Sequence, residues 1–230
     1  MDNLTRLQYL EAMGIDVWVS RHQPLVADLS VVSAAVIDNE SIDRVNLNKD
    51  KWNILQKEVL ECVKCTLCEN RTQTVFGVGK KNSDWMLIGE ALGYNEDLQG
   101  KPFVGQAGLL LTEMIRAMGL ERDSVYIANI LKCKLPDEKK PKVEEIKACG
   151  DYLQRQIQLV QPKIILAIGR VAAQTLLETK EPLTKLRGVS HQLAGIPLIV
   201  VYHPAYLLRS LLEKRNAWKD IQLAIETYNQ

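Results

Sequence analysis

This chain of 230 residues has little of three features: long apolar runs, an apolar N-terminal segment and net charge. Its longest apolar runs, such as residues 164–168 and 196–202, are far too short to span a bilayer, so we expect no membrane anchor. The N-terminus, MDNLTRLQYL, lacks the uninterrupted apolar core of a signal peptide, which favours a cytoplasmic protein. The formal net charge is only +1, so a nucleic-acid partner would have to be bound by a local basic patch.

The composition is that of a globular protein. Hydrophobic residues make up 47% of the chain, which is ample for a buried core. We divide the chain into a short N-terminal docking peptide or cap (1–21), a linker (22–49) and one domain (50–230). Apolar residues recur regularly in the first segment, whereas no period persists in the second. The sequence therefore predicts one sizeable domain with an appendage.

Cysteines are few, but four of the five have an informative spacing. Cys62 and Cys65 form a C-x2-C pair, and Cys133 and Cys149 follow much later in the chain. This pattern is typical of a metal or iron–sulfur site rather than a disulfide framework, and a redox-active C-x2-C pair is the main alternative. Zinc and a 4Fe-4S cluster both accept four thiolates, so the pattern does not choose the metal. Cys68 competes as a ligand.

Four apolar runs alternate with helical stretches along the domain. The expected strands are 85–89, 125–131, 163–169 and 197–202, and the expected helices between and beside them are 107–118, 143–160 and 171–178. Near-continuous Ile, Val and Leu runs separated by helices indicate parallel strands that are covered on both faces. We therefore expect an α/β fold, a three-layer α/β/α sandwich around a central four-stranded, mostly parallel sheet.

Polar residues stand at or just after the ends of three of these strands. They are Glu90, Asn129 and His203. Ligands of open α/β sheets bind outside the carboxyl ends of the strands, so the three residues are expected to converge on one edge. Each has an ordinary alternative, since Glu90 could cap a helix, Asn129 could hold a turn and His203 could be a core histidine. Their joint placement favours a site.

Four motifs, together with the cysteine spacing, carry a resemblance to a known family. They are GEALGYNED (89–97), GKPFVGQAG (100–108), YIANILKC (126–133) and YHPAYLLR (202–209). From about Val59 to Lys219 the chain resembles the family 4 uracil-DNA glycosylases, the iron–sulfur branch of the uracil-DNA glycosylase superfamily. The resemblance implies a repair enzyme that flips uracil out of DNA and hydrolyses its N-glycosidic bond, leaving an abasic site for base excision repair.

The resemblance also implies a cofactor and a setting. Cys62, Cys65, Cys133 and Cys149 would hold a 4Fe-4S cluster with a structural role, and Cys68 falls where the family needs no ligand. The expected partner is uracil-containing DNA, without a membrane. We expect a monomer in the bacterial cytosol, associated with the nucleoid.

Individual roles follow from the same resemblance. Phe103 would stack on the flipped uracil, and Asn129 would read its edge with an amide that both donates and accepts. His203 would hydrogen-bond the developing uracil oxyanion. Glu90 would orient or activate water, with Glu96 as a supporting carboxylate. Further candidates lie beside these residues: Gly89, Ala91 and Gly93 for substrate binding, and Lys132, Lys134, Tyr206, Leu207 and Arg209 for DNA binding.

Two positions depart from the family pattern. Leu92 stands where the family usually has proline, and Glu138 where it commonly has asparagine. The competing interpretation is a catalytically weak or inactive glycosylase-like DNA-binding module, against which the retained set of pocket residues argues. A nucleotide-binding Rossmann protein is disfavoured, because the glycines of 77–79 precede the first expected strand instead of following it.

A second resemblance concerns residues 7–21. The segment MGIDVW (13–18) is similar to the N-terminal peptide of the bacterial clamp-loader psi subunit, and Trp18 would be its buried anchor. The alternative is a cap that packs on the chain's own domain. The resemblance implies that residues 1–21 tether the domain to a clamp loader or another replication protein, with residues 22–49 as a flexible connection.

Overall fold

The computed structural model of the chain describes residues 39–136 and 140–230. The proposed clamp-loader peptide and Glu138 therefore lie outside the described residues. Helix α2 (Asn39–Leu60) begins within the segment that we predicted as a linker, so the last part of that segment is helical. The remaining domain boundaries stay predictions.

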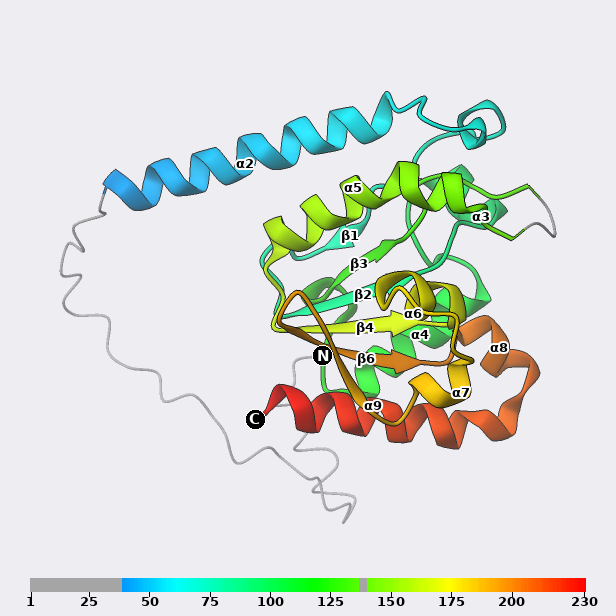
Figure 1. The fold of residues 1–230 in the computed structure, drawn as a ribbon. Helices are drawn as coiled ribbons and strands as arrows, with labels where there is room; N and C mark the ends of the chain where they lie inside the picture. The colour runs from blue at the N-terminus through cyan, green and yellow to red at the C-terminus, as the bar shows by residue number, and fades with distance from the viewer. Residues whose placement is uncertain (1–38, 137–139) are drawn as a thin grey trace, which may run out of the picture. The chain divides into compact units, whose positions relative to one another are not determined.

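The domain consists of alternating strands and helices (Figure 1). After α2 and the 3-10 helix η1 (Thr66–Glu69), the elements in chain order are β1 (Val78–Gly79), β2 (Trp85–Gly89), α3 (Tyr94–Gln99), α4 (Gln106–Ala117), η2 (Arg122–Ser124), β3 (Tyr126–Asn129), α5 (Val143–Val160), β4 (Ile164–Ile168), α6 (Arg170–Leu176), α7 (Leu183–Leu186), β5 (Ser190–Leu193), β6 (Ile196–Val201), α8 (Pro204–Arg209), η3 (Leu211–Glu213) and α9 (Lys214–Tyr228).

The strands form one sheet in the order β1-β3-β2-β4-β6-β5. The four predicted strands are its parallel centre, and β1 and β5 are added antiparallel at the two edges. The described sheet therefore has six strands, and our expectation of four was wrong. Strand β1 has only two residues, and β5 alternates exposed with half-buried positions. Neither edge strand shows the fully buried apolar run that marks a central strand.

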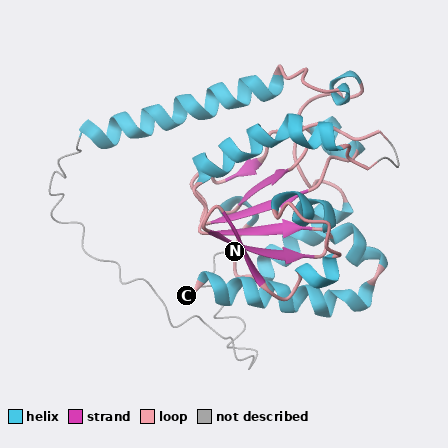
Figure 2. Cartoon of the chain, in the orientation of Figure 1, coloured by secondary structure: helices cyan, strands magenta, loops and turns pink. Residues whose placement is uncertain are grey.

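Two layers of helices cover the sheet (Figure 2), which confirms the predicted α/β class and sandwich. Met86 and Ile88 pack with residues of α2, α5, α6 and α7. Trp85 and Leu87 point to the opposite face and pack with α4 and α9. This alternation has the two-residue period of a strand that is buried on both sides. The core therefore lies on both faces of the sheet, and the edge at the carboxyl ends of the strands is left for polar residues.

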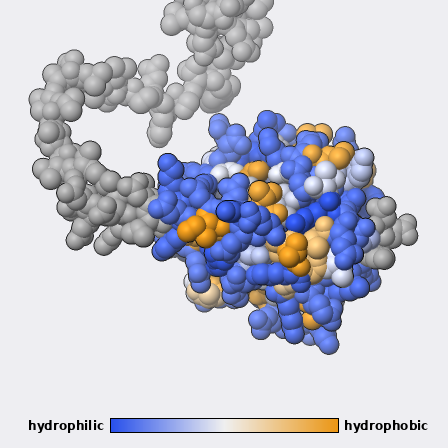
Figure 3. Space-filling model, turned by 90° about the horizontal axis from the view of Figure 1, so that it is seen from above, coloured by the Kyte–Doolittle hydropathy of each residue, from blue (hydrophilic) through white to orange (hydrophobic). Residues whose placement is uncertain are grey.

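The outer surface is mixed. The face shown in Figure 3 is largely hydrophilic and is broken by small hydrophobic patches. Within the described ranges, no helix combines the length and the hydrophobicity that a bilayer crossing needs.

Candidate active site

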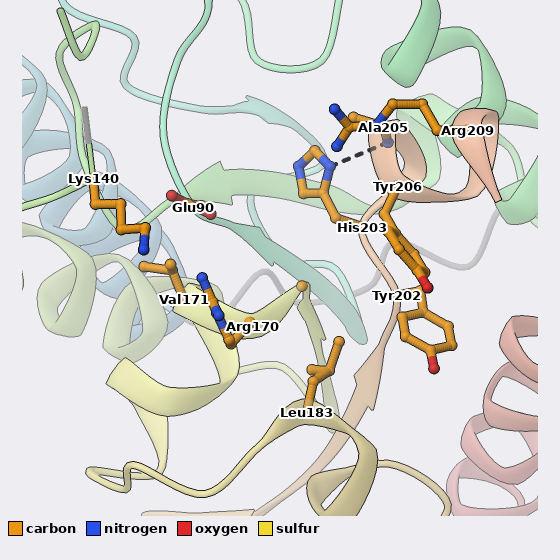
Figure 4. Close-up of a pocket in the computed structure, with 11 residues that line it drawn as sticks. Glu90, Lys140, Arg170, Val171, Leu183, Tyr202, His203, Ala205, Tyr206 and Arg209 are labelled. Atoms are coloured by element: carbon orange, nitrogen blue, oxygen red, sulfur yellow. Dashed lines mark hydrogen bonds between the residues drawn. The ribbon is translucent and has the colours of Figure 1, made fainter. Parts of the chain in front are cut away.

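The carboxyl ends of the parallel strands bring the predicted polar residues together. Gly89, the last residue of β2, is paired in register with Asn129, the last residue of β3. Strand β6 runs parallel to β4 and leads through Tyr202 to His203 at the same edge. A pocket of about 340 Å³ opens there, and Glu90 and His203 both line it (Figure 4). Glu90, Asn129 and His203 thus gather at one edge of the sheet, as predicted. Asn129 and Phe103 are not among the described residues that line the pocket itself.

The space around Gly89 is filled by the side chains of Asn129 and Phe103. A Cβ atom at this position would collide with the side-chain oxygen of Asn129 and would lie 2.6 Å from the Phe103 ring. Asn129 is 2% exposed, and its Oδ1 has no hydrogen-bond partner among the described residues. A buried acceptor without a donor costs about 1–3 kcal/mol. The arrangement therefore suits a planar ligand that lies against Phe103 and donates an N–H group to Asn129.

His203 is held in one tautomer by the start of α8. Its Nδ1 accepts a hydrogen bond from the backbone N–H of Ala205 at 3.2 Å (Figure 4). Because an amide can only donate, Nδ1 is unprotonated, and the neutral ring carries its hydrogen on Nε2. The pKa of His203 is lowered to about 4, mainly by burial; the charge of Glu96 opposes this shift and the charge of Arg209 adds to it. His203 is therefore a neutral donor, with its ring centre 5.7 Å from that of Phe103.

Glu90 lies directly after β2 and lines the same pocket, between Lys140 and His203 in the view of Figure 4. Its side chain is half-buried. Burial raises the pKa of Glu90, and the positive charge of Arg170 partly offsets this effect. A carboxylate in such surroundings is a better proton acceptor than an exposed one, which is the property that a general base needs.

Glu96 binds backbone amides, a contact that the sequence did not predict. Its Oε2 accepts from the backbone N–H of Gly93 at 3.1 Å, and its Oε1 accepts from that of Val104 at 3.0 Å. Both oxygens thus bind backbone amides, one at the start of α3 and one in the loop after Phe103. This geometry supports a positioning role, and the supporting catalytic role stays a prediction. Ala91 packs against the cluster that contains Leu131 and Cys133, and its role in substrate binding stays a prediction.

The predicted DNA-contact residues of α8 separate into two groups. Tyr206 and Arg209 are exposed and line the pocket. Leu207 is 1% exposed and packs with Ala217, so our prediction that it contacts DNA was wrong. Leu208 is 41% exposed. One turn of helix points neighbouring side chains in different directions, so Leu208 is the leucine that can reach a ligand outside the protein.

Lys132 is also corrected by the structure. It is 1% exposed, and its Nζ donates to the backbone oxygen of Asn129 at 2.8 Å and to Oε1 of Gln156 at 2.6 Å. Burial lowers its pKa to about 7. The amino group thus lies in the core and cannot contact a phosphate. The sequence offered one sign of this burial, because Lys132 directly follows the apolar run 125–131. Lys134 is half-buried, with its Nζ 5.5 Å from the ring centre of Tyr94, and remains a candidate.

The cysteines gather around one small pocket. All five are free; Cys133 and Cys149 are buried, and Cys62, Cys65 and Cys68 are half-buried. The space between them is about 10 Å³, roughly what one water molecule needs. Among the described residues, no three His, Cys, Asp or Glu side chains are arranged to hold a metal ion. The cysteine thiols fit a thiolate-ligated group in chemistry, and all five line the same pocket.

Two arginines were missed by the sequence reasoning. Arg71 donates to Sγ of Cys133 at 3.1 Å, next to the cysteine pocket. Arg122 donates to the backbone oxygens of Pro102 and Phe103 at 2.9 and 3.0 Å. Neither lies in one of the four motifs, and both contacts join segments far apart in the chain. No local pattern therefore indicated them.

Comparison with known proteins gives a consistent result. A family model described as the uracil DNA glycosylase superfamily matches residues 76–222. The chain is 40% identical to the type-4 uracil-DNA glycosylase of Archaeoglobus fulgidus, over 66% of this chain and 80% of that protein. It is 41% identical to the type-4 uracil-DNA glycosylase of Sulfurisphaera tokodaii, over 72% and 81%. For the enzyme of the same name from Thermotoga maritima the identity is 41%, over 76% and 94%.

Proposed function

The chain belongs to the uracil DNA glycosylase superfamily, and from this premise we propose that it removes uracil from DNA by hydrolysing the N-glycosidic bond. The observation that carries the proposal is the unpaired, buried Oδ1 of Asn129 beside the Phe103 ring. Uracil has an N–H donor at N3 next to a carbonyl acceptor, and the Asn129 amide complements both. Cytosine reverses this donor and acceptor, so it would leave the buried amide mispaired.

The base must leave the duplex to reach Asn129, as in other enzymes that act on a base. We propose that the flipped uracil stacks on Phe103, next to Gly89. Exposed Tyr206, Leu208 and Arg209 on α8 support a DNA-contacting surface beside the pocket. In this proposal Leu208 fills the space that the base leaves, and Arg209 binds a phosphate.

His203 would stabilise the leaving base. When the bond from sugar C1′ to uracil N1 breaks, the electron pair stays on uracil and its negative charge spreads to the carbonyl oxygens. A neutral His203 with hydrogen on Nε2 can donate to that oxygen without first taking up a proton. A preorganised donor of this kind contributes about 3 kcal/mol to the transition state.

Glu90 would act on the other side of the broken bond. Its carboxylate favours the cationic, oxocarbenium-like sugar and accepts a proton from the water that attacks C1′. The water oxygen forms the new bond to C1′, and the products are free uracil and an abasic site. The raised pKa of Glu90 supports this role, because the carboxylate is poorly solvated before the reaction.

We also propose that Cys62, Cys65, Cys133 and Cys149 hold a 4Fe-4S cluster, as the resemblance implies. When bound, the cluster supplies thiolate–iron bonds that join the two cysteine segments, and it takes no redox part in hydrolysis. The placement of all five cysteines around one pocket supports this proposal. We further propose a cytoplasmic monomer that works in base excision repair, with residues 1–21 as a tether to a clamp loader.

The test is a single-turnover assay on an oligonucleotide with one uracil, followed by alkaline cleavage of the abasic product. Wild-type protein should cut at uracil and leave matched cytosine and thymine oligonucleotides intact. His203→Ala should slow excision by roughly a hundredfold, whereas His191→Ala, a histidine that contacts the backbone oxygen of Leu186, should not. Binding of uracil DNA without cutting would refute the enzyme and favour the binding-module alternative.

A further inference from the structure

Phe103 adopts a backbone conformation that aromatic residues rarely take. Its φ is 54°, in the left-handed region that glycine and asparagine visit more easily. Such strain persists only where neighbouring groups hold the backbone in place. The ring at this position is crowded against Gly89 and lies 5.7 Å from the ring of His203, centre to centre. The residue with the strained backbone thus carries the ring that lies against Gly89 and next to His203.

Arg122 holds the carbonyl side of this residue. Its Nη2 donates to the backbone oxygens of Pro102 at 2.9 Å and Phe103 at 3.0 Å, and its Nη1 donates to Oγ1 of Thr112 at 3.0 Å. A guanidinium presents its donors in a fixed planar fork, which lets one side chain bind several acceptors at defined angles. The Thr112 contact ties the fork to α4.

Glu96 holds the following amide. Its Oε1 accepts from the N–H of Val104 at 3.0 Å, while its Oε2 is fixed on Gly93. At Gly108, in the first turn of α4, a Cβ atom would collide with the carbonyl group of Phe103. The peptide on the C-terminal side of Phe103 is therefore held by a cation at its oxygen and by an anion at its N–H.

We propose that Arg122 is a positioning residue for base binding, because it fixes the strained backbone that holds the Phe103 ring against Gly89 and next to His203. The inference rests on the proposed function, since it takes the ring to be the surface on which uracil stacks. Arg122 does not touch the base in this arrangement and acts only through Phe103. A purely structural role would predict that loss of Arg122 lowers stability without changing how free uracil binds.

The experiment compares Arg122→Ala and Arg122→Lys with Arg116→Ala, whose guanidinium is exposed and pairs with Glu113. Inhibition of single-turnover excision by free uracil measures base binding, and affinity for abasic-site DNA serves as the reference without a base. Arg122→Ala should weaken uracil inhibition about tenfold, equivalent to about 1.4 kcal/mol. The affinity for abasic DNA should stay within twofold. Arg122→Lys should fall in between, because an ammonium cannot reproduce the planar fork.

A double-variant test and an exchange measurement separate the possible outcomes. Phe103→Ala should weaken uracil inhibition by itself, and adding Arg122→Ala should cause no further loss, because both act through one ring. Amide exchange in residues 103–105 should rise in Arg122→Ala and not in Arg116→Ala. Additive losses, or a lower melting temperature with unchanged uracil inhibition, would overturn the proposal. Unchanged exchange in residues 103–105 would overturn the proposal even if wild-type protein failed to excise uracil. Failure of the wild type to excise uracil would instead contradict the proposed function.

Discussion

The neutral state of His203 should persist far below the pH at which an ordinary histidine takes up a proton. Burial brings its pKa from 6.5 down to about 4, and the nearest charges, Glu96 and Arg209, act in opposite directions. The gap corresponds to about 3 kcal/mol at 1.36 kcal/mol per pH unit. Excision that depends on this neutral donor should therefore show no loss centred near pH 6.5.

The same pKa affects stability, with a definite sign. The unfolded chain binds a proton at His203 below about pH 6.5, whereas the folded chain does so only near pH 4. This part of the unfolding free energy is thus fully present above pH 6.5 and is lost as the pH falls toward 4. At pH 5 the loss from His203 should be about 2 kcal/mol, and His203→Gln should abolish that part of the pH dependence.

Two measurements test this reasoning. Denaturant unfolding of wild type and His203→Gln at pH 7 and pH 5 gives the difference in unfolding free energy. Single-turnover excision between pH 4.5 and 8, with enzyme in excess, gives the pH dependence of the chemical step. An acid limb that reflects Glu90 should move or disappear in Glu90→Gln. A rate that titrates near pH 6.5 in wild type, but not in a His203 variant, would refute the neutral-donor assignment.

Other predictions concern recognition, the cluster, the core lysine and the N-terminus. Asn129→Asp should lower the ratio of uracil to cytosine excision, because the amide donor is lost; an unchanged ratio would contradict the pocket assignment. Anaerobically purified protein should absorb near ~400 nm through thiolate–iron charge transfer. Cys133→Ala should lose this band and Cys68→Ala should keep it, whereas a colourless protein with stoichiometric zinc would exclude the cluster. Lys132→Met should destabilise the fold by about 1–3 kcal/mol, since buried acceptors lose their donor, and should leave the salt dependence of DNA binding unchanged. Deleting residues 1–21 should not alter excision on naked oligonucleotides but should abolish capture by an immobilised clamp loader.

The centre of the fold was predictable because its strands have one physical interpretation. A fully buried parallel strand reads as an uninterrupted apolar run, and all four such runs became β2, β3, β4 and β6. The edge strands were not predictable by this rule. Strand β1 is too short to carry a pattern, and β5 is paired along one side only and faces solvent.

The site was predictable to the extent that topology alone determines it. Parallel strands place Glu90, Asn129 and His203 at one edge whatever the side chains do next. The orientation of charged side chains could not be predicted in this way, because it depends on contacts between distant segments. Arg122 reaches the carbonyls of residues 102 and 103 only after α4 folds between them, and no local pattern records that contact.

Lys132 and Glu96 show that a charged residue within a family motif can bind the protein backbone instead of pointing freely toward a ligand. Each lies within a few residues of Asn129 or Phe103 along the chain or in space, and each binds a backbone group of that segment. Lys132 binds the backbone oxygen of Asn129, and Glu96 binds the amide that follows Phe103. Rigid recognition of a planar base requires that the reading amide and the stacking ring do not move. Lys132 and Glu96 should therefore contribute to specificity through geometry, and their replacement should alter base binding more than DNA binding.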